Sequence, residues 1–97
     1  MKTKELLQYL DTNNLAYLTK LKELELSELK LKEVFNYYDG NLDGIVEIDN
    51  NNYYYTFIDK DKQNNRIFIV INTNNYKFNN WQELFSRDLD ILGYFIN

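Results

Sequence analysis

The chain has 97 residues, 44% of them hydrophobic, which is enough for one globular domain over residues 1–97. Its net charge of −4 disfavours direct binding to the phosphates of DNA or RNA. Cysteine and histidine are absent, which excludes disulfides, thiolate chemistry and histidine-based catalysis or metal binding.

The acidic charge is concentrated in the later two thirds of the chain. Residues 1–32 carry six lysines and five acidic residues, whereas residues 33–97 carry five basic and ten acidic residues. The N-terminal sequence lacks the apolar run of a signal peptide, and no window is apolar enough to cross a membrane. We therefore expect a cytoplasmic protein with no membrane contact.

Apolar residues at helical spacing predict three N-terminal helices. The first begins at Thr3, a suitable N-cap, and ends before the polar residues 11–14. The second contains the leucines at positions 15, 18 and 21. The third spans residues 27–38 and begins at Ser27. Its apolar residues have the i, i+3, i+4, i+7 spacing of a buried helix face, and they are Leu31, Val34, Phe35 and Tyr38.

After Gly44 the apolar period changes from 3.6 to 2, which predicts strands. Residues 45–49 and 53–58 flank three asparagines and predict a hairpin, because asparagine tolerates positive φ. Residues 66–71 are apolar on both faces, as expected of a central strand that follows a polar turn. Asn80 and the glutamate three residues later resemble a capping box. The helix predicted after it buries Trp81, Leu84, Phe85, Leu89 and Leu92.

This order of elements predicts an α+β fold with three N-terminal helices, a three-stranded antiparallel sheet and a C-terminal helix. Residues 3–58 resemble the winged helix-turn-helix class: Leu24-Glu25-Leu26-Ser27 is similar to its tight turn, and residues 44–58 are similar to its wing. The resemblance implies that the third helix enters the major groove of DNA. Two positions depart from the class, since Leu21 replaces a small residue and the glutamate of the turn replaces a glycine.

Residues 39–50 resemble the calcium loop of an EF-hand. Oxygen-bearing side chains stand at loop positions 1, 3, 5 and 9, and glycine stands at position 6. Asn50 occupies the last position, where that family has a bidentate glutamate, and a strand is predicted to follow in place of a helix. We therefore predict a polar turn here and no metal site. No cofactor motif is found elsewhere in the sequence.

The most informative feature is a stretch from Glu33 to Asp59 that has six carboxylates, five tyrosines and no lysine or arginine. Such a segment predicts a surface that repels phosphates and attracts a basic protein groove. On a strand, Glu47 and Asp49 would point to one face. The predicted partner-binding residues are the acids Asp39, Asp43, Glu47 and Asp49, with Tyr37, Tyr53 and Tyr55 as aromatic anchors.

Catalysis is not predicted. The acid pairs Asp59/Asp61 and Asp88/Asp90 lie in a turn and on diverging helix positions, and no phosphate-binding loop is present. The favoured hypothesis is a small acidic, non-enzymatic protein that inhibits a basic, nucleic-acid-handling protein or nucleoprotein complex as a DNA mimic. Its class would be that of anti-CRISPR and other anti-defence inhibitors of phages and mobile elements.

Two alternatives belong to other classes. The first is a winged helix-turn-helix DNA-binding transcriptional regulator, which would use Lys30, Lys32 and Asn36 on its third helix and the asparagines at the wing tip. The second is an interaction module that forms a homodimer through an exposed edge of its sheet.

Overall fold

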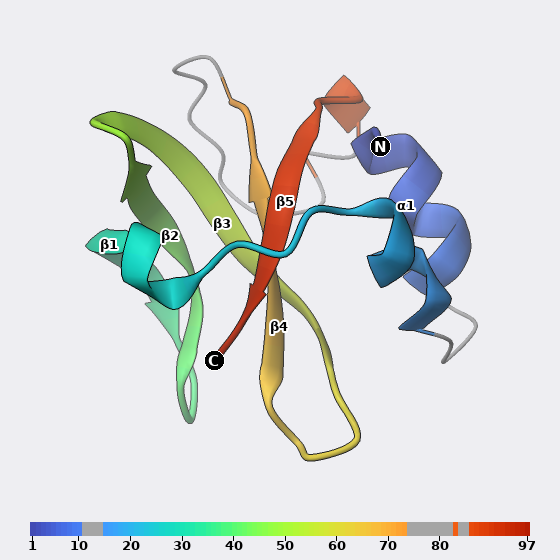
Figure 1. The fold of residues 1–97 in the computed structure, drawn as a ribbon, viewed down its shortest axis with the longest axis horizontal. Helices are drawn as coiled ribbons and strands as arrows, with labels where there is room; N and C mark the ends of the chain where they lie inside the picture. The colour runs from blue at the N-terminus through green and yellow to red at the C-terminus, as the bar shows by residue number, and fades with distance from the viewer. Residues whose placement is uncertain (11–14, 74–82, 84–85) are drawn as a thin grey trace.

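Five antiparallel strands, arranged in chain order, form the framework of the protein (Figure 1). The structure is a computed structural model that describes residues 1–10, 15–73, 83 and 86–97. The strands are β1 (Lys30–Tyr37), β2 (Asn41–Ile48), β3 (Asn51–Lys60), β4 (Arg66–Ile71) and β5 (Ile91–Ile96). The helical elements are α1 (Thr3–Leu10) and the short 3-10 turns η1 (Leu15–Lys20) and η2 (Leu26–Glu28).

The predicted fold class was wrong, because the described part of the chain has one helix of seven or more residues and a five-stranded sheet. Residues 27–38, predicted as a recognition helix, form η2 and the edge strand β1. The resemblance to a winged helix-turn-helix is therefore lost. The second predicted helix is reduced to η1, and residues 91–96 form β5 where the end of a C-terminal helix was expected. Of its predicted core residues, Trp81, Leu84 and Phe85 lie outside the described residues, whereas Glu83, Ser86 and Arg87 are helical.

A bulge in β1 explains why Leu31 and Val34 stand at a helical spacing. Leu31 pairs with Val46 of β2, and Val34 pairs with Gly44, two residues further along the same strand. Val46 and Gly44 are alternate residues of β2 and therefore lie on the same face of the sheet. Their partners Leu31 and Val34 consequently share that face, although three positions separate them in the sequence. The register shift that begins after Leu31 supplies the extra residue. The bulge thus places Leu31 and Val34 on one face at a helical spacing, whereas Phe35 lies on the other face, against Tyr54.

Other elements agree with the sequence analysis. The first helix begins at Thr3, the hairpin is formed by β2 and β3, and β4 is the strand of residues 66–71. The turn of the β2–β3 hairpin consists of Asp49 and Asn50. Their φ angles of 50° and 67° lie in the left-handed region, which asparagine and aspartate tolerate best after glycine. The hairpin turn therefore begins one residue before the predicted asparagine run.

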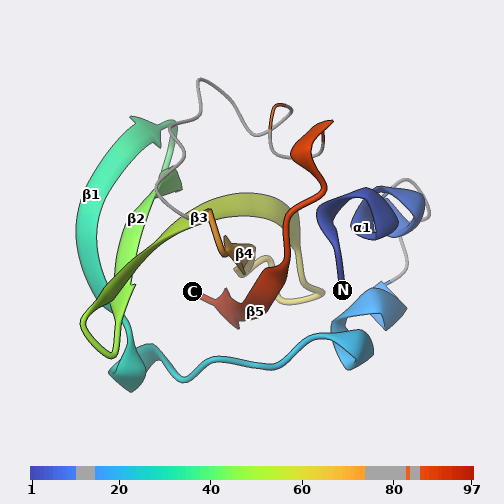
Figure 2. The same ribbon diagram turned by 90° about the horizontal axis from the view of Figure 1, so that it is seen from above.

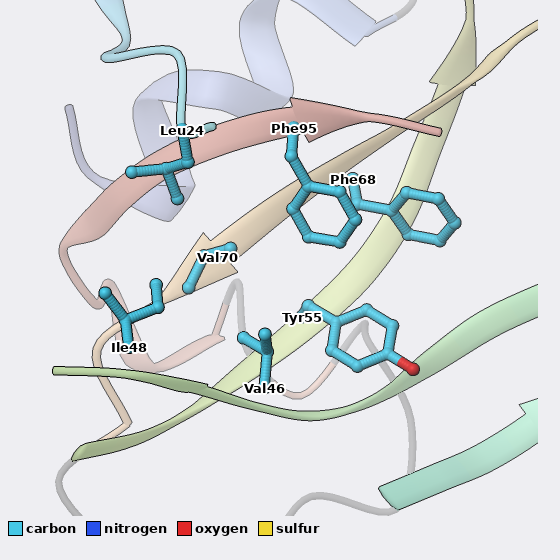
Figure 3. Close-up of a cluster of buried hydrophobic side chains, with 7 residues drawn as sticks. All are labelled: Leu24, Val46, Ile48, Tyr55, Phe68, Val70 and Phe95. Atoms are coloured by element: carbon cyan, nitrogen blue, oxygen red, sulfur yellow. The ribbon is translucent and has the colours of Figure 1, made fainter. Parts of the chain in front are cut away.

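Two apolar clusters lie on the two faces of the sheet. The first contains Leu6 of α1 and Tyr17 of η1, packed against β3, β4 and β5. The second lies on the other face, where Leu24 covers side chains from four strands (Figure 3). Its members are Leu24, Val46, Ile48, Tyr55, Phe68, Val70 and Phe95.

The segment between η1 and β1 crosses β5 and runs on to the far edge of the curved sheet (Figure 2). Leu24 donates its backbone N–H to the carbonyl oxygen of Tyr94 at 2.8 Å, and Tyr94 donates to that of Lys22 at 2.9 Å. Gly93 is needed here, because a Cβ atom at this position would lie 2.5 Å from the Lys22 carbonyl oxygen. These contacts hold the segment against β5 before it reaches β1.

Candidate protein-binding surface

Strand β1 is an exposed edge strand, and four of its eight residues are large hydrophobic ones. All eight of its residues are exposed, and β2 is its only neighbouring strand in the described sheet. Within the described residues, six of the eight exposed large hydrophobic side chains belong to residues 26–38. They form what we call the β1 surface, namely Leu26, Leu31, Val34, Phe35, Tyr37 and Tyr38. Such a concentration of exposed apolar side chains is typical of an interaction site.

The middle of the β1 surface is supported from below. The ring of Phe35 stacks on that of Tyr54 of β3, with centroids 6.2 Å apart and an angle of 26° between the planes. Tyr54 is itself buried in the first apolar cluster. Phe35 therefore has a defined position although it is 46% exposed, and a partner would not have to order it on binding.

Arg66 holds the turn between β1 and β2. Its guanidinium donates to the carbonyl oxygens of Tyr38, Asp39 and Asn41 at 3.2, 2.9 and 2.9 Å, and it lies over the ring of Phe57. Residue 40 is a glycine with φ of 138°, and a Cβ atom there would lie 2.8 Å from the guanidinium carbon. The arginine therefore fixes the turn that carries Tyr37 and Tyr38.

Asp43, predicted as an exposed docking acid, lies beneath β1 and is only 8% exposed. Its carboxylate accepts a hydrogen bond from Asn36 Nδ2 at 2.8 Å and a second from the hydroxyl of Tyr54. Burial, and then the hydrogen bond to Asp43, raise the pKa of Tyr54 well above its ordinary value. Asp43 therefore ties β1 to β2 and β3 and is not available to a partner.

Tyr55, predicted as an anchor, is fully buried in the second cluster. Its hydroxyl accepts a hydrogen bond from Asn41 Nδ2 at 2.6 Å, and its ring lies edge-on to Phe68 (Figure 3). Burial raises the pKa of Tyr55. Tyr53 is half-buried against the same cluster. Neither ring belongs to the exposed surface around β1.

The other predicted residues lie at two ends of β2. Tyr37 belongs to the β1 surface and Asp39 is exposed next to it, whereas Asp49 is exposed in the turn at the opposite end of β2. Seven steps of about 3.3 Å separate the ends of this strand, roughly 23 Å, which exceeds the screening length of about 8 Å in physiological salt. Glu47, between them, is half-buried and pairs with Lys32 Nζ at 3.3 Å. The acids thus do not form one continuous row.

The charged residues around the β1 surface are predominantly acidic. Two lysines, Lys30 and Lys32, lie within β1, and Lys32 is paired with Glu47. Four exposed carboxylates belong to the same stretch of chain, and these are Glu25, Glu28, Glu33 and Asp39. The surface therefore has an apolar centre and a net negative surround.

The exposure of Leu31, Val34 and Phe35 was missed by the sequence analysis, which placed them on a buried helix face. A signal was present, because Val34, Phe35 and the two following tyrosines belong to the residue types that favour strands. Their exposure could not be predicted from the sequence, because the apolar residues of a core strand and of an uncovered edge strand form the same pattern.

The stretch that resembled an EF-hand is not a loop. Residues 41–48 form β2, so their side chains alternate between the two faces of the sheet. Gly44 serves the sheet instead, because a side chain there would collide with the carbonyl oxygen of Glu33 in β1. Within the described ranges, no group of three or more acidic side chains is arranged to hold a metal ion.

Comparison of the chain with protein-family models, with curated proteins and with solved structures gives no match. None of the helices in the described part of the chain has the length and apolar character required to cross a membrane.

Proposed function

We propose that this chain is a small, non-enzymatic binding protein that docks its β1 surface onto a larger protein. The observation that supports the proposal is the edge strand itself, whose apolar side chains are between 44% and 55% exposed. Tyr37, which ends the strand, and Tyr38, which follows it, are 74% and 79% exposed. Rigid aromatic side chains of this kind are frequent among the residues that contribute most to binding energy.

The charges around the surface favour a cationic partner. Four exposed carboxylates accompany the apolar centre, and the chain as a whole carries a charge of −4. Complementary charge would attract a surface rich in lysine and arginine and would orient it during encounter. Proteins that handle nucleic acids have such surfaces, because they must neutralise phosphates.

The proposed activity is inhibition of such a partner in the cytoplasm by occupying the groove that would hold its nucleic acid. An acidic domain without cysteine or histidine suits this role better than it suits catalysis. The proposed class is that of anti-CRISPR and related anti-defence inhibitors. The acidic residues of this surface include Glu33 within β1 and Asp39 just after it. They take the role that the sequence analysis gave to a longer row of acids.

A capture experiment with matched variants tests the docking surface. The double variant F35S/Y38S should bind a captured partner about tenfold or more weakly than the natural chain, because two exposed anchors are lost. L7S is the control, since Leu7 is 41% exposed on α1, outside the β1 surface. Equal capture by both variants would refute docking through β1.

Competition with nucleic acid tests the nature of the partner. Duplex DNA or RNA should displace this chain from the captured protein, because both would occupy one cationic groove. In a gel-shift assay the chain alone should retard no duplex at low salt. The inhibitory mechanism would be contradicted if the partner stayed bound to this chain in excess nucleic acid, or if the chain itself retarded DNA.

A further inference from the structure

The outer edge of β1 has no neighbouring strand in the described sheet, and this edge carries exposed apolar side chains. An unpaired strand of this kind presents free backbone N–H and C=O groups to any other extended chain. Lysines and bulges are features that weaken such pairing, and β1 contains both. Any association through this edge should therefore be weak and reversible.

The sequence of β1 is complementary to itself in one register. Leu31 and Val34 share a face because of the bulge, and Lys32 and Glu33, of opposite charge, lie between them. In an antiparallel pair with its two-fold axis between positions 32 and 33, each Lys32 lies opposite Glu33 of the second copy. Each Leu31 then lies opposite Val34 of the second copy. Opposite charges and apolar pairs in directly opposed positions stabilise antiparallel strands.

The neighbouring registers are worse. An axis through Glu33 would oppose the two Glu33 carboxylates, and like charges in opposed positions are unfavourable. An axis through Val34 would oppose Glu33 to Phe35 and would leave Lys32 opposite Asn36, so no ion pair would form. The favoured register also brings the aliphatic stem of Lys30 against the ring of Phe35, a contact that arginine and lysine make readily with aromatic rings.

We infer that two copies of this chain pair through β1 in that register when no partner is bound. The pairing would cover the apolar edge of the free protein, and a partner would have to displace the second copy before it could dock. Self-association would thus regulate the β1 surface by competition. Only this regulatory part rests on the proposed function, since the pairing itself is a property of the chain alone.

Sedimentation equilibrium with charge variants tests the pairing. The natural chain should dimerise as its concentration rises. E33K should weaken the dimer about tenfold or more, because Lys32 of each copy would then face a lysine at position 33 of the other copy. The triple variant K32E/E33K/E47Q should restore the dimer, because each glutamate again faces a lysine and E47Q removes the carboxylate that Lys32 neutralises in the natural chain. E28K is the matched control and should dimerise as the natural chain does, because Glu28 lies in η2, outside the paired residues.

Disulfide trapping provides a second measurement that does not depend on charge. The chain contains no cysteine, so a mixture of L31C and V34C should form mixed disulfides faster than either variant alone. A natural chain that is monomeric at every concentration would overturn the inference. So would a dimer that E33K leaves intact, failure of the triple variant to restore it, or trapping without preference for the mixed pair. If β1 variants still reduced partner capture, the proposed function would survive that result.

Discussion

Buried hydroxyl and carboxylate groups explain much of what individual residues do in this protein. Asp43 accepts hydrogen bonds from residues in β1 and β3, so one carboxylate joins three strands at the edge of the sheet. Tyr17 is different, because it is fully buried and its hydroxyl has no hydrogen-bond partner among the described residues. A buried hydroxyl without a partner costs about 1–3 kcal/mol relative to an apolar group of the same shape.

Asp43 should therefore prove to be a structural residue. We expect D43N to lower the free energy of unfolding by about 1–3 kcal/mol, because an amide nitrogen would replace one acceptor oxygen and would face a donor. D49N makes the same chemical change at an exposed turn position where asparagine is tolerated, so it should change stability by less than about 0.5 kcal/mol. Urea denaturation of both variants provides the measurement, and equal effects would contradict this role.

At the scale of elements, the turn between β1 and β2 depends on a side chain from β4. Arg66 satisfies three carbonyl oxygens of residues 38–41 that would otherwise rely on water. Its guanidinium also occupies the space beside Gly40, where no other residue fits without a shift. The position of the two exposed tyrosines is thus decided more than 25 residues away along the chain.

Replacement of Arg66 should loosen this turn selectively. R66M keeps an unbranched aliphatic side chain but removes the guanidinium and with it every donor, so we expect faster hydrogen exchange of the amides of residues 38–41. K62M removes a cation from an exposed turn and serves as the control. Exchange measured by NMR or mass spectrometry should be unchanged in the control. Unaltered exchange of the turn in R66M would show that Arg66 does not hold it.

The whole molecule depends on both faces of one sheet, and each face buries a tyrosine-containing cluster. Burial raises the pKa values of Tyr17, Tyr54 and Tyr55 above the ordinary value of 10.0. For such groups the folded state holds its proton more tightly than the unfolded state does. The stability that results is complete below pH 10 and is lost as the pH rises through the folded-state values.

We therefore expect unfolding in alkaline solution, beginning above about pH 10, where ionisation of buried tyrosines favours the unfolded chain. Phenolate absorbance of these side chains should appear together with the loss of circular dichroism and not before it. Y17F should shift the unfolding midpoint to higher pH, because it removes one such group together with an unpaired hydroxyl. Phenolate absorbance that is complete in the folded protein would contradict this expectation.

Several elements were accessible from local sequence alone, namely the first helix, the β2–β3 hairpin and the strand of residues 66–71. Each has a strong local signal: a capped amphipathic helix, a turn rich in asparagine, or a continuous run of branched apolar residues. The acidic, tyrosine-rich character of residues 33–59 and its exclusion of basic residues are likewise evident from the residues themselves.

The state of residues 27–38 depended on contacts between distant parts of the chain. Their spacing fits a helix, and the strand forms because residues 30–37 pair with β2, which happens only when the sheet assembles. The same pairing turned Asp43 and Tyr55 inward and left Phe35 and Tyr38 exposed. Local propensity does not predict which side chains are buried, because burial depends on what packs against a side chain and not on the side chain alone.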